Sequence, residues 1–551
     1  MMVNISRQVE NFWNHHSTDA KLFLTFILAA SVFMQWGGYN DSSRLFLSES
    51  IVEEGDLDIS ENWNKTGDRV FYQGEYYSDK PPVSSLLGVP AYIAADGLFS
   101  SSSPSQDYIA FGTDLNGNDV YAPVNPSKKK VFSQIFFVFL TAVLPGGLTV
   151  ILLRKILSNY YDLIISQIVS AMFGFGTLIF HYSHMANGAM LGTLFTVASL
   201  YFYTSEVDHG RILSGICLGL AFSTAFYTLY ILISFYCLFW FKEEFSDILR
   251  LSSGVFIGFL PLLMYIYFIS TFDTTFISNL FLTTFSSRVP ATELSTGMEV
   301  VRTPLRVLLD ALTTAPKLLF YPSGGLLFYS PFLIVSLFVI RKKKNMKWQE
   351  WWPLLILFLG VLFNSLFVFW WAGSSFSTRY LLPVIPFLSL PLASVIENSK
   401  KSKRLIYFLF PLSALNMLAG TNGGISQWGG ELASRYSISG GHILTSPRYS
   451  DTIIDIELLI ENLTPYSLGN YFQHLKWLWK DGPGGRLITS SLSEGVINIH
   501  YFADKHITTF LEIAGFELTT RWIPLTLVLA ISFVIWRNEI LNCLGLKLSN
   551  T

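Results

Sequence analysis

Long apolar runs dominate this 551-residue chain and constrain its fold more than any other feature. A helix needs about 20 mostly apolar residues to cross the hydrocarbon core of a bilayer. Only 14% of the residues are charged and the mean hydropathy is +0.42, whereas about 25% are charged in soluble domains. We therefore expect an all-α polytopic membrane protein with roughly 11–13 transmembrane helices. The expected spans are 21–37, 131–153, 162–181, 186–204, 212–240, 251–270, 317–340, 352–371, 379–396, 405–421 and 522–541.

Two apolar runs leave the number of crossings open. The run 83–99 is short, and Gly88, Pro90 and Asp96 interrupt it. We expect it to be a helix lying in the membrane interface, with a crossing as the alternative. The run 212–240 is long enough for one span or for a kinked pair of shorter helices.

The charge balance excludes several classes of protein. The formal net charge is -2, and a nucleic-acid-binding protein would show a basic surplus. An intrinsically disordered chain would combine low hydrophobicity with high net charge.

The three cysteines lie in or beside apolar runs, so we expect neither a disulfide framework nor a CxxC metal site. The run 21–37 lacks a clear cleavage site, and we interpret it as a retained span.

Basic clusters near the ends of spans predict the orientation. The strongest are 341–344 and 400–404. Residues 128–130, three lysines, would then lie outside, against the rule. We expect a multi-pass protein of the plasma (inner) membrane with its chemistry on the extracytoplasmic face. Four segments would lie on that face: 38–130, the turn near 181–187, 271–316 and 422–521.

Three parts of the chain follow from this orientation. Residues 1–421 would form the transmembrane core, with 38–130 as a large first extracytoplasmic loop that carries interfacial helices. Residues 422–521 resemble a small α+β extracytoplasmic segment, because 486–502 alternates as strands do and 466–480 is amphipathic. Residues 522–551 would be the final transmembrane helix and tail.

The first loop carries the strongest functional signal. Asp41 and Arg44 follow the first span directly, before an expected helix at 45–54, and Asp79 and Lys80 precede Pro81-Pro82. A carboxylate near the membrane surface can take a proton from an acceptor hydroxyl. A neighbouring cation can neutralise the charge on a departing phosphate. This pattern suits the transfer of a group from a phosphate carrier.

The two motifs, in this order, resemble the GT-C superfamily of membrane glycosyltransferases. The most similar groups are the lipid A aminoarabinose transferases and the protein O-mannosyltransferase-like enzymes (glycosyltransferase families 39 and 83). The resemblance covers roughly residues 20–400. It implies a multi-span enzyme that transfers a sugar from a polyprenyl or dolichyl phosphate to an acceptor, with inversion at the anomeric carbon.

The resemblance also implies roles for individual residues. Asp41 and Asp79 match the catalytic acidic positions, and Arg44 and Lys80 match residues that contact the donor phosphate. One departure is Ser42, which stands where such enzymes often have a second acidic residue, and this weakens the case for a metal site. The alternative is purely structural. Asp41 could cap the following helix, and the segment from Asp79 could be an ordinary turn.

Arg379 is a further candidate for contact with the lipid phosphate. It begins an expected span on the outer side, after Trp370 and Trp371. An arginine there is costly unless it pairs or faces a cavity. An Arg-Tyr-x-x-Pro stretch also occurs in the families that the chain resembles. The alternative is interfacial anchoring by tryptophan and snorkelling by arginine.

Three polar residues at the outer end of the third span, His181, His184 and Asn187, are candidates for acceptor binding or metal ligation. The spacing of the two histidines can place both imidazoles on one helical face. The cofactor that we consider is a divalent cation, Mg²⁺, Mn²⁺ or Zn²⁺. The alternative is polar residues at an interface. Asp56-Leu57-Asp58 looks like the Asp-x-Asp motif of nucleotide-sugar enzymes, but we interpret it as a turn.

The sequence therefore predicts a membrane glycosyltransferase with a polyprenyl-phosphate-linked sugar donor, the lipid bilayer and a glycan, lipid or protein acceptor as partners. No nucleic acid is expected. One alternative is an oligosaccharide or O-antigen type ligase with a diphosphate-linked donor, which would need more basic residues outside. Others are a transporter or flippase, which should show repeats and charges at mid-bilayer, and a non-catalytic scaffold.

Overall fold

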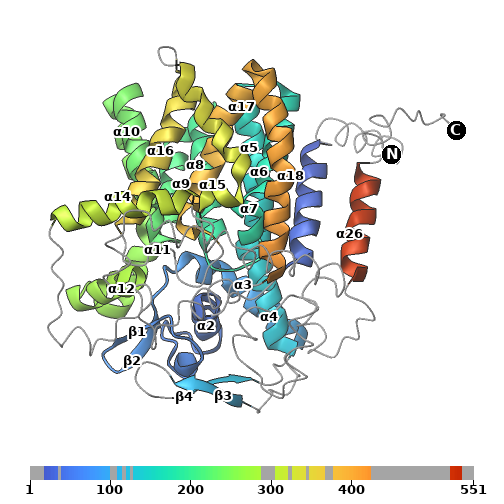
Figure 1. The fold of residues 1–551 in the computed structure, drawn as a ribbon. Helices are drawn as coiled ribbons and strands as arrows, with labels where there is room; N and C mark the ends of the chain where they lie inside the picture. Colours follow the sequence, from blue (N-terminus) through green and yellow to red (C-terminus); the bar gives the residue numbers. More distant parts are fainter. Residues whose placement is uncertain are drawn as a thin grey trace, which may run out of the picture.

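The computed structural model describes residues 18–34, 39–99, 108–113, 119–123, 128–286, 304–320, 325–342, 346–366, 377–423 and 522–536. Within these ranges the protein is mostly helical, and its apolar helices form one bundle (Figure 1). The expected α+β segment, apart from its first two residues, and Trp370-Trp371 lie outside the described residues.

The described chain divides into a helical bundle and a cap at one end of it (Figure 1). A helix at 18–32 precedes both. The cap contains α2 (Tyr39–Glu53), η1 (Ser60–Lys65), β1 (Arg69–Tyr72), β2 (Glu75–Ser78), α3 (Val83–Phe99), β3 (Tyr108–Thr113), β4 (Asp119–Pro123), the start of α4 (Lys128–Val138) and α12 (Thr274–Ser286). The bundle contains η2 (Phe139–Val143), α5 (Leu144–Ser158), α6 (Leu163–Gly176), α7 (Leu178–Tyr182), α8 (Ala189–Thr204), α9 (Gly210–Phe222), η3 (Phe226–Thr228), α10 (Leu229–Lys242), α11 (Phe245–Ser270), α14 (Pro304–Phe320), α15 (Leu326–Tyr329), η4 (Pro331–Lys342), α16 (Trp348–Ser365), η5 (Arg379–Leu388), α17 (Ser389–Asn398) and α18 (Lys400–Gly423).

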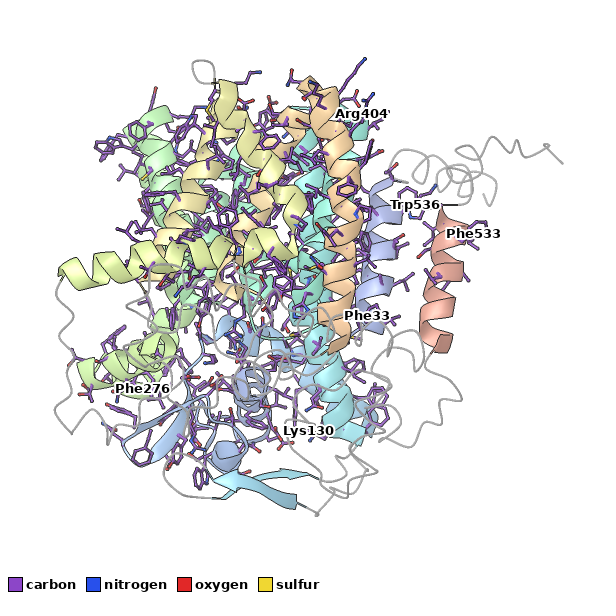
Figure 2. All side chains as sticks on the ribbon, viewed as in Figure 1. Phe33, Lys130, Phe276, Arg404, Phe533 and Trp536 are labelled. Atoms are coloured by element: carbon purple, nitrogen blue, oxygen red, sulfur yellow. The ribbon has the colours of Figure 1, made fainter. Side chains whose placement is uncertain are left out.

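Two labelled basic residues lie at opposite ends of the protein. Arg404, at the start of α18, lies at the end farthest from the cap, whereas Lys130 lies in the cap (Figure 2). The last described helix, α26 (Trp522–Ile535), lies beside the helix 18–32. The Trp536 indole nitrogen donates a hydrogen bond to Thr25 Oγ1 at 2.8 Å. Arg404 and the first loop thus lie at opposite ends of the protein.

The expectation of an all-α fold is wrong in the first loop, where the chain forms two antiparallel hairpins, β1–β2 and β3–β4. Aromatic and β-branched residues favour strands. Gln73 and Gly74 form the turn of the first hairpin with φ of 51° and 98°, and such a two-residue turn matches the twist of the strands.

Several predicted spans are interrupted. Within the described residues, three helices are long and apolar enough to cross a membrane, Phe132–Ser158, Phe245–Ser270 and Arg379–Asn398. The prediction of one span at 317–340 is wrong, because α14 ends at Phe320 and α15 and η4 follow the glycine pair 324–325. The run 212–240 is a pair of helices, α9 and α10, as one of the two interpretations held.

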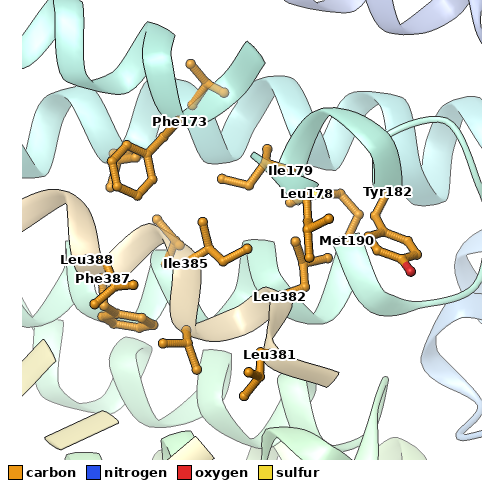
Figure 3. Close-up of a cluster of buried hydrophobic side chains, with 14 of the residues drawn as sticks. Phe173, Leu178, Ile179, Tyr182, Met190, Leu381, Leu382, Ile385, Phe387 and Leu388 are labelled. Atoms are coloured by element: carbon orange, nitrogen blue, oxygen red, sulfur yellow. The ribbon is translucent and has the colours of Figure 1, made fainter. Parts of the chain in front are cut away.

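Bulky apolar side chains fill the centre of the bundle. Helices α6 and α7 meet η5 there, and the cluster is shown in Figure 3. Each of these side chains is almost fully buried, so the junction of α7 with η5 is a packed core. The cluster includes Phe173, Leu178, Ile179, Leu382, Ile385 and Leu388.

Helices α9 and α11 approach each other so closely that only glycine fits at their crossing. A Cβ on Gly215 would lie 2.1 Å from the Leu251 carbonyl oxygen, and one on Gly219 would lie 2.4 Å from that of Val255. Gly258 faces them from α11. Small residues at regular spacing allow this approach between apolar helices.

Candidate functional site

The first motif lies inside a helix. We expected a helix at 45–54, with Asp41 ahead of it, but α2 begins at Tyr39. Asp41 is therefore in the first turn, where a negative charge complements the helix dipole, and it is not the N-cap residue of the structural alternative. Its side chain is fully buried, and Oδ2 accepts a hydrogen bond of 2.9 Å from the Ala186 backbone N–H. This bond orients the carboxylate against the turn between α7 and α8.

Arg44 lies one turn further along α2 and is 3% exposed. Its Nη1 donates to the Asn40 carbonyl oxygen at 3.1 Å and also to the Asn40 side chain. Burial lowers the pKa of Arg44, and the charges of Asp41 and Asp79 oppose that effect. A guanidinium keeps its proton under such conditions, so a positive charge is held inside the protein.

Gly188 allows Arg44 to occupy this position. It has φ of +76°, which a glycine adopts readily. A Cβ built there would lie 2.7 Å from Arg44 Nη2. The turn before α8 therefore contacts α2 at two points, through Ala186 on Asp41 and through Gly188 on Arg44.

A side-chain hydrogen bond joins the two motifs. Ser43 Oγ lies 2.7 Å from Ser78 Oγ, and both serines are fully buried. Ser43 is adjacent to Arg44, and Ser78 is adjacent to Asp79. Motifs that are 35 residues apart in sequence thus form a single polar cluster.

The second motif contains a chain of charges in which Asp79 is buried and Lys80 and Asp68 are partly buried. Lys80 Nζ lies 3.0 Å from Asp79 Oδ2 and 3.1 Å from Asp68 Oδ2. Burial raises the pKa of Asp79 to about 6, with Asp68 adding to the rise and Lys80 and Arg44 opposing it. Burial alone would lower the pKa of Lys80, but Asp68 and Asp79 outweigh it and the net shift is upward. Lys80 is therefore a retained cation, and the segment is unlike a solvated turn.

Helices of the bundle hold the second motif in place. The Tyr265 hydroxyl, on α11, donates to the Ser78 carbonyl oxygen at 3.0 Å. The Val83 backbone N–H donates to the Ser223 carbonyl oxygen at 3.4 Å, at the end of α9. The close crossing of α9 and α11 thus fixes the segment that carries Asp79 and Lys80.

The two histidines lie together, and the described residues place no third metal ligand beside them. The rings of His181 and His184 are 5.0 Å apart and both side chains are fully buried. His184 Nδ1 lies 3.1 Å from the Phe180 carbonyl oxygen. Across the described ranges, no group of three or more His, Cys, Asp or Glu side chains could hold a metal ion. The divalent cation that we considered from the sequence stays a prediction.

Asn187 is the third polar residue of that turn. Its Oδ1 accepts a hydrogen bond of 3.0 Å from the Ala189 backbone N–H, and so satisfies the first N–H group of α8. The side chain is 5% exposed. Asn187 therefore shapes the loop that covers Asp41 and Arg44.

Arg379 begins η5 and lies beside two tyrosines. Its guanidinium carbon is 5.5 Å from the Tyr380 ring, and the Tyr380 ring is 4.9 Å from that of Tyr227. Tyr227 interacts electrostatically with Arg379 and also with Arg44. The structure thus brings Arg379 into the neighbourhood of the first motif.

Two lysines in the first turn of α4, Lys129 and Lys130, form ion pairs with carboxylates. Lys129 Nζ lies 2.5 Å from Glu53 Oε1 and 2.7 Å from Asp96 Oδ1, and Lys130 Nζ lies 2.7 Å from Glu49 Oε2. These pairs join α2, α3 and α4. Because carboxylates neutralise both lysines, they are a weak argument against the predicted orientation.

The Asp-x-Asp stretch behaves as a turn. Asp58 Oδ1 accepts a hydrogen bond of 2.9 Å from the Ser60 backbone N–H. Asp56 Oδ1 accepts one of 2.5 Å from the Leu57 N–H. Both carboxylates accept hydrogen bonds from nearby backbone N–H groups, which agrees with the turn that we expected.

Sequence reasoning missed Asp68, Ser43, Ser78, Gly188 and Tyr227. The signal for Gly188 was an Asn-Gly pair ahead of an apolar run, which is typical of a turn. The two serines and Asp68 carry no local signal, because their partners are distant in sequence.

Comparisons with known proteins give a weak structural likeness. No protein-family model matches the chain, and no curated protein matches it in sequence. Similar solved structures include the crystal structure of ArnT from Cupriavidus metallidurans bound to undecaprenyl phosphate, at 12% identity and a TM-score of 0.46, over 91% of this chain and 88% of that one. The apo ArnT structure gives the same identity and TM-score over 92% and 89%. ArnT is a lipid A aminoarabinose transferase, one of the groups that the sequence motifs resemble. A likeness at this level leaves the function to be argued from the chain's own residues.

Proposed function

We propose that the protein is an integral membrane glycosyltransferase of the GT-C type. It transfers a sugar from a polyprenyl phosphate donor to a glycan, lipid or protein acceptor, on the extracytoplasmic face of the plasma (inner) membrane and with inversion. The observation that carries the proposal is the Ser43–Ser78 hydrogen bond of 2.7 Å, because it joins an acidic and basic pair on α2 to a second such pair beside α3.

The charges of this cluster suit a phosphate leaving group. Arg44 is a buried cation and Lys80 a partly buried one, and each is in electrostatic contact with carboxylates that hold its charge. In a site with little water, fixed cations stabilise developing negative charge far more than they would in solution. We assign the donor phosphate to Arg44 and Lys80, with Arg379 as a third contact.

Asp41 is the proposed general base. The Ala186 N–H fixes the orientation of its carboxylate. The acceptor hydroxyl oxygen attacks the anomeric carbon, and its proton passes to Asp41. The bond between that carbon and the phosphate oxygen breaks, and the electron pair leaves with the polyprenyl monophosphate, whose charge Arg44 and Lys80 balance. In-line attack of this kind inverts the anomeric centre.

Asp79 has a supporting role in this proposal. Together with Asp68 it raises the pKa of Lys80 and orients the Lys80 ammonium. We also propose that Asp79 positions the acceptor. No step of the proposed reaction passes through a divalent cation.

The test is radiolabelled sugar transfer in detergent with two donors, a polyprenyl monophosphate sugar and a polyprenyl diphosphate sugar. Each donor is assayed with and without EDTA. Transfer from the monophosphate donor, unaffected by EDTA, is the expected result. Transfer from the diphosphate donor alone would assign the protein to the ligase class, and loss of transfer with EDTA would require a metal in the site.

A further inference from the structure

Tyr227 lies between the two arginines of the candidate site. It is the middle residue of η3, the short turn between α9 and α10. Its ring packs at 4.9 Å from that of Tyr380, the neighbour of Arg379. The side chain also interacts electrostatically with Arg44, on α2. Tyr227 therefore connects the start of η5 with the first motif.

The Tyr227 hydroxyl oxygen is buried and makes no hydrogen bond to any described residue. This is unusual, since buried polar groups nearly always have a partner. The neighbouring Tyr230 shows the ordinary situation, because its buried hydroxyl donates to the Tyr380 carbonyl oxygen at 2.9 Å. The two tyrosines are one helical turn apart, so the difference comes from what each hydroxyl faces.

Three other hydrogen-bond donors, on Arg44 and on residues next to Gly188 and Arg379, also lack a partner within the described part of the chain. Arg44 Nε, Asn187 Nδ2 and Thr378 Oγ1 are buried without a hydrogen-bond partner among the described residues. Each of these three side chains is at most 5% exposed. Asn187 precedes the glycine that contacts Arg44, and Thr378 precedes Arg379. Several unsatisfied hydrogen-bond donors beside two cations are what a site for an oxyanion requires.

We propose that Tyr227 is a phosphate-binding residue of the candidate site, whose hydroxyl donates a hydrogen bond to a phosphate oxygen held between Arg44 and Arg379. The ligand is a phosphate monoester, with the polyprenyl phosphate carrier as its source. The choice of the polyprenyl phosphate carrier as the source rests on the proposed function, which this inference deepens. It adds an uncharged hydrogen-bond donor to a phosphate site for which the sequence predicted only charged residues.

Tyr227→Phe is the test variant, because it removes the hydroxyl and keeps the ring. Tyr230→Phe is the matched control, because it removes a hydroxyl that is already satisfied. The purified full-length protein is compared by its apparent unfolding temperature in detergent, alone and with undecaprenyl phosphate or inorganic phosphate. Ligand that binds only the folded state raises this temperature.

The expected results for the two variants are opposite. Tyr227→Phe keeps or raises the unfolding temperature, since it removes an unpaired buried group. It also weakens binding of undecaprenyl phosphate by about tenfold or more, as loss of a hydrogen bond to a charged group does. Tyr230→Phe lowers the unfolding temperature and leaves the dissociation constant near that of the wild type. Inorganic phosphate shows the same ranking with a smaller temperature shift.

Three results would overturn the assignment. They are wild-type binding by Tyr227→Phe, a lowered unfolding temperature together with lost binding in that variant, and a wild-type protein that neither phosphate stabilises. A different result would refute the proposed function and leave this inference standing. Binding that depends on the Tyr227 hydroxyl, in a protein that transfers no sugar, would support this inference and refute the glycosyltransferase.

Discussion

Gly188→Ala tests whether the position of Arg44 governs donor binding. The substitution has two effects that can be separated. The first is backbone strain, because φ is +76°, and a side chain in that left-handed region costs about 1–2 kcal/mol. The second is a clash, because the new Cβ would lie 2.7 Å from Arg44 Nη2. Arg44 must then move by about 1 Å to reach an ordinary carbon contact of roughly 3.5–4.0 Å.

The size of the effect on activity follows from that displacement. A misplacement of about 1 Å at a group that binds the reacting centre can lower the rate about 10²-fold. We expect a loss of this order in kcat/KM for the polyprenyl phosphate donor. The apparent unfolding temperature should fall by only a few degrees, as backbone strain of about 1–2 kcal/mol implies.

Gly55→Ala is the control for backbone strain. Gly55 has φ of +71°, and a Cβ there meets no atom within 4 Å. It should lower the unfolding temperature by an amount similar to Gly188→Ala and leave transfer unchanged. Sugar-transfer kinetics and thermal unfolding of the three proteins, measured side by side, decide the question. Equal activity in the two variants would refute the idea that Gly188 positions Arg44 for the donor.

Three further outcomes follow from the packing and charges of the site. Gly219→Ala places a Cβ 2.4 Å from the Val255 carbonyl oxygen, so it should severely lower the yield of folded protein. Gly97→Ala is the control, because a Cβ there meets only open space and should leave the yield unchanged. Size-exclusion profiles in detergent compare the two variants, and a normal profile for Gly219→Ala would contradict the close crossing of α9 and α11. The pKa of Asp79 is raised to about 6 in the folded protein, so the fold favours the protonated carboxyl. Its contribution to the free energy of unfolding is therefore full below the pKa of about 3.9 in the unfolded chain, and it is lost as the pH rises through about 6. The unfolding temperature of the wild type relative to Asp79→Asn should therefore fall between pH 4 and pH 7, and a constant difference would contradict the burial of this carboxyl. In a double-mutant cycle, Ser43→Ala and Ser78→Ala should show a coupling of about 0.5–1.5 kcal/mol in unfolding free energy, and additive effects would contradict their hydrogen bond.

The sequence predicted the main helices and the two motifs because both have local signatures. Apolar runs mark helices whatever they pack against. The motifs stand out because charged residues are scarce in this chain. The pairing of Asp41 and Arg44 with Asp79 and Lys80 in one cluster was thus accessible, but the contacts that achieve it were not.

The errors have physical causes in particular residues. The start of α2 was placed too late because Asp and Ser usually compete with helix hydrogen bonds through their own side chains. Here Asp41 bonds to Ala186 and Ser43 bonds to Ser78, so partners elsewhere in the fold occupy these groups and the helix extends back to Tyr39. The hairpin β1–β2 was missed although Gln73-Gly74 lies between aromatic and β-branched residues, a pattern that favours a turn between strands.

The most direct measurement of the central claim is sugar transfer by Asp41→Asn from a radiolabelled polyprenyl monophosphate donor. The variant keeps the shape of the side chain and an oxygen that can accept the Ala186 N–H, but it has no basic carboxylate. We predict a folded protein, with the elution profile of the wild type, that still binds undecaprenyl phosphate and transfers no sugar above background. Turnover like that of the wild type in this variant would contradict the assignment of Asp41 as the base and the proposed site with it.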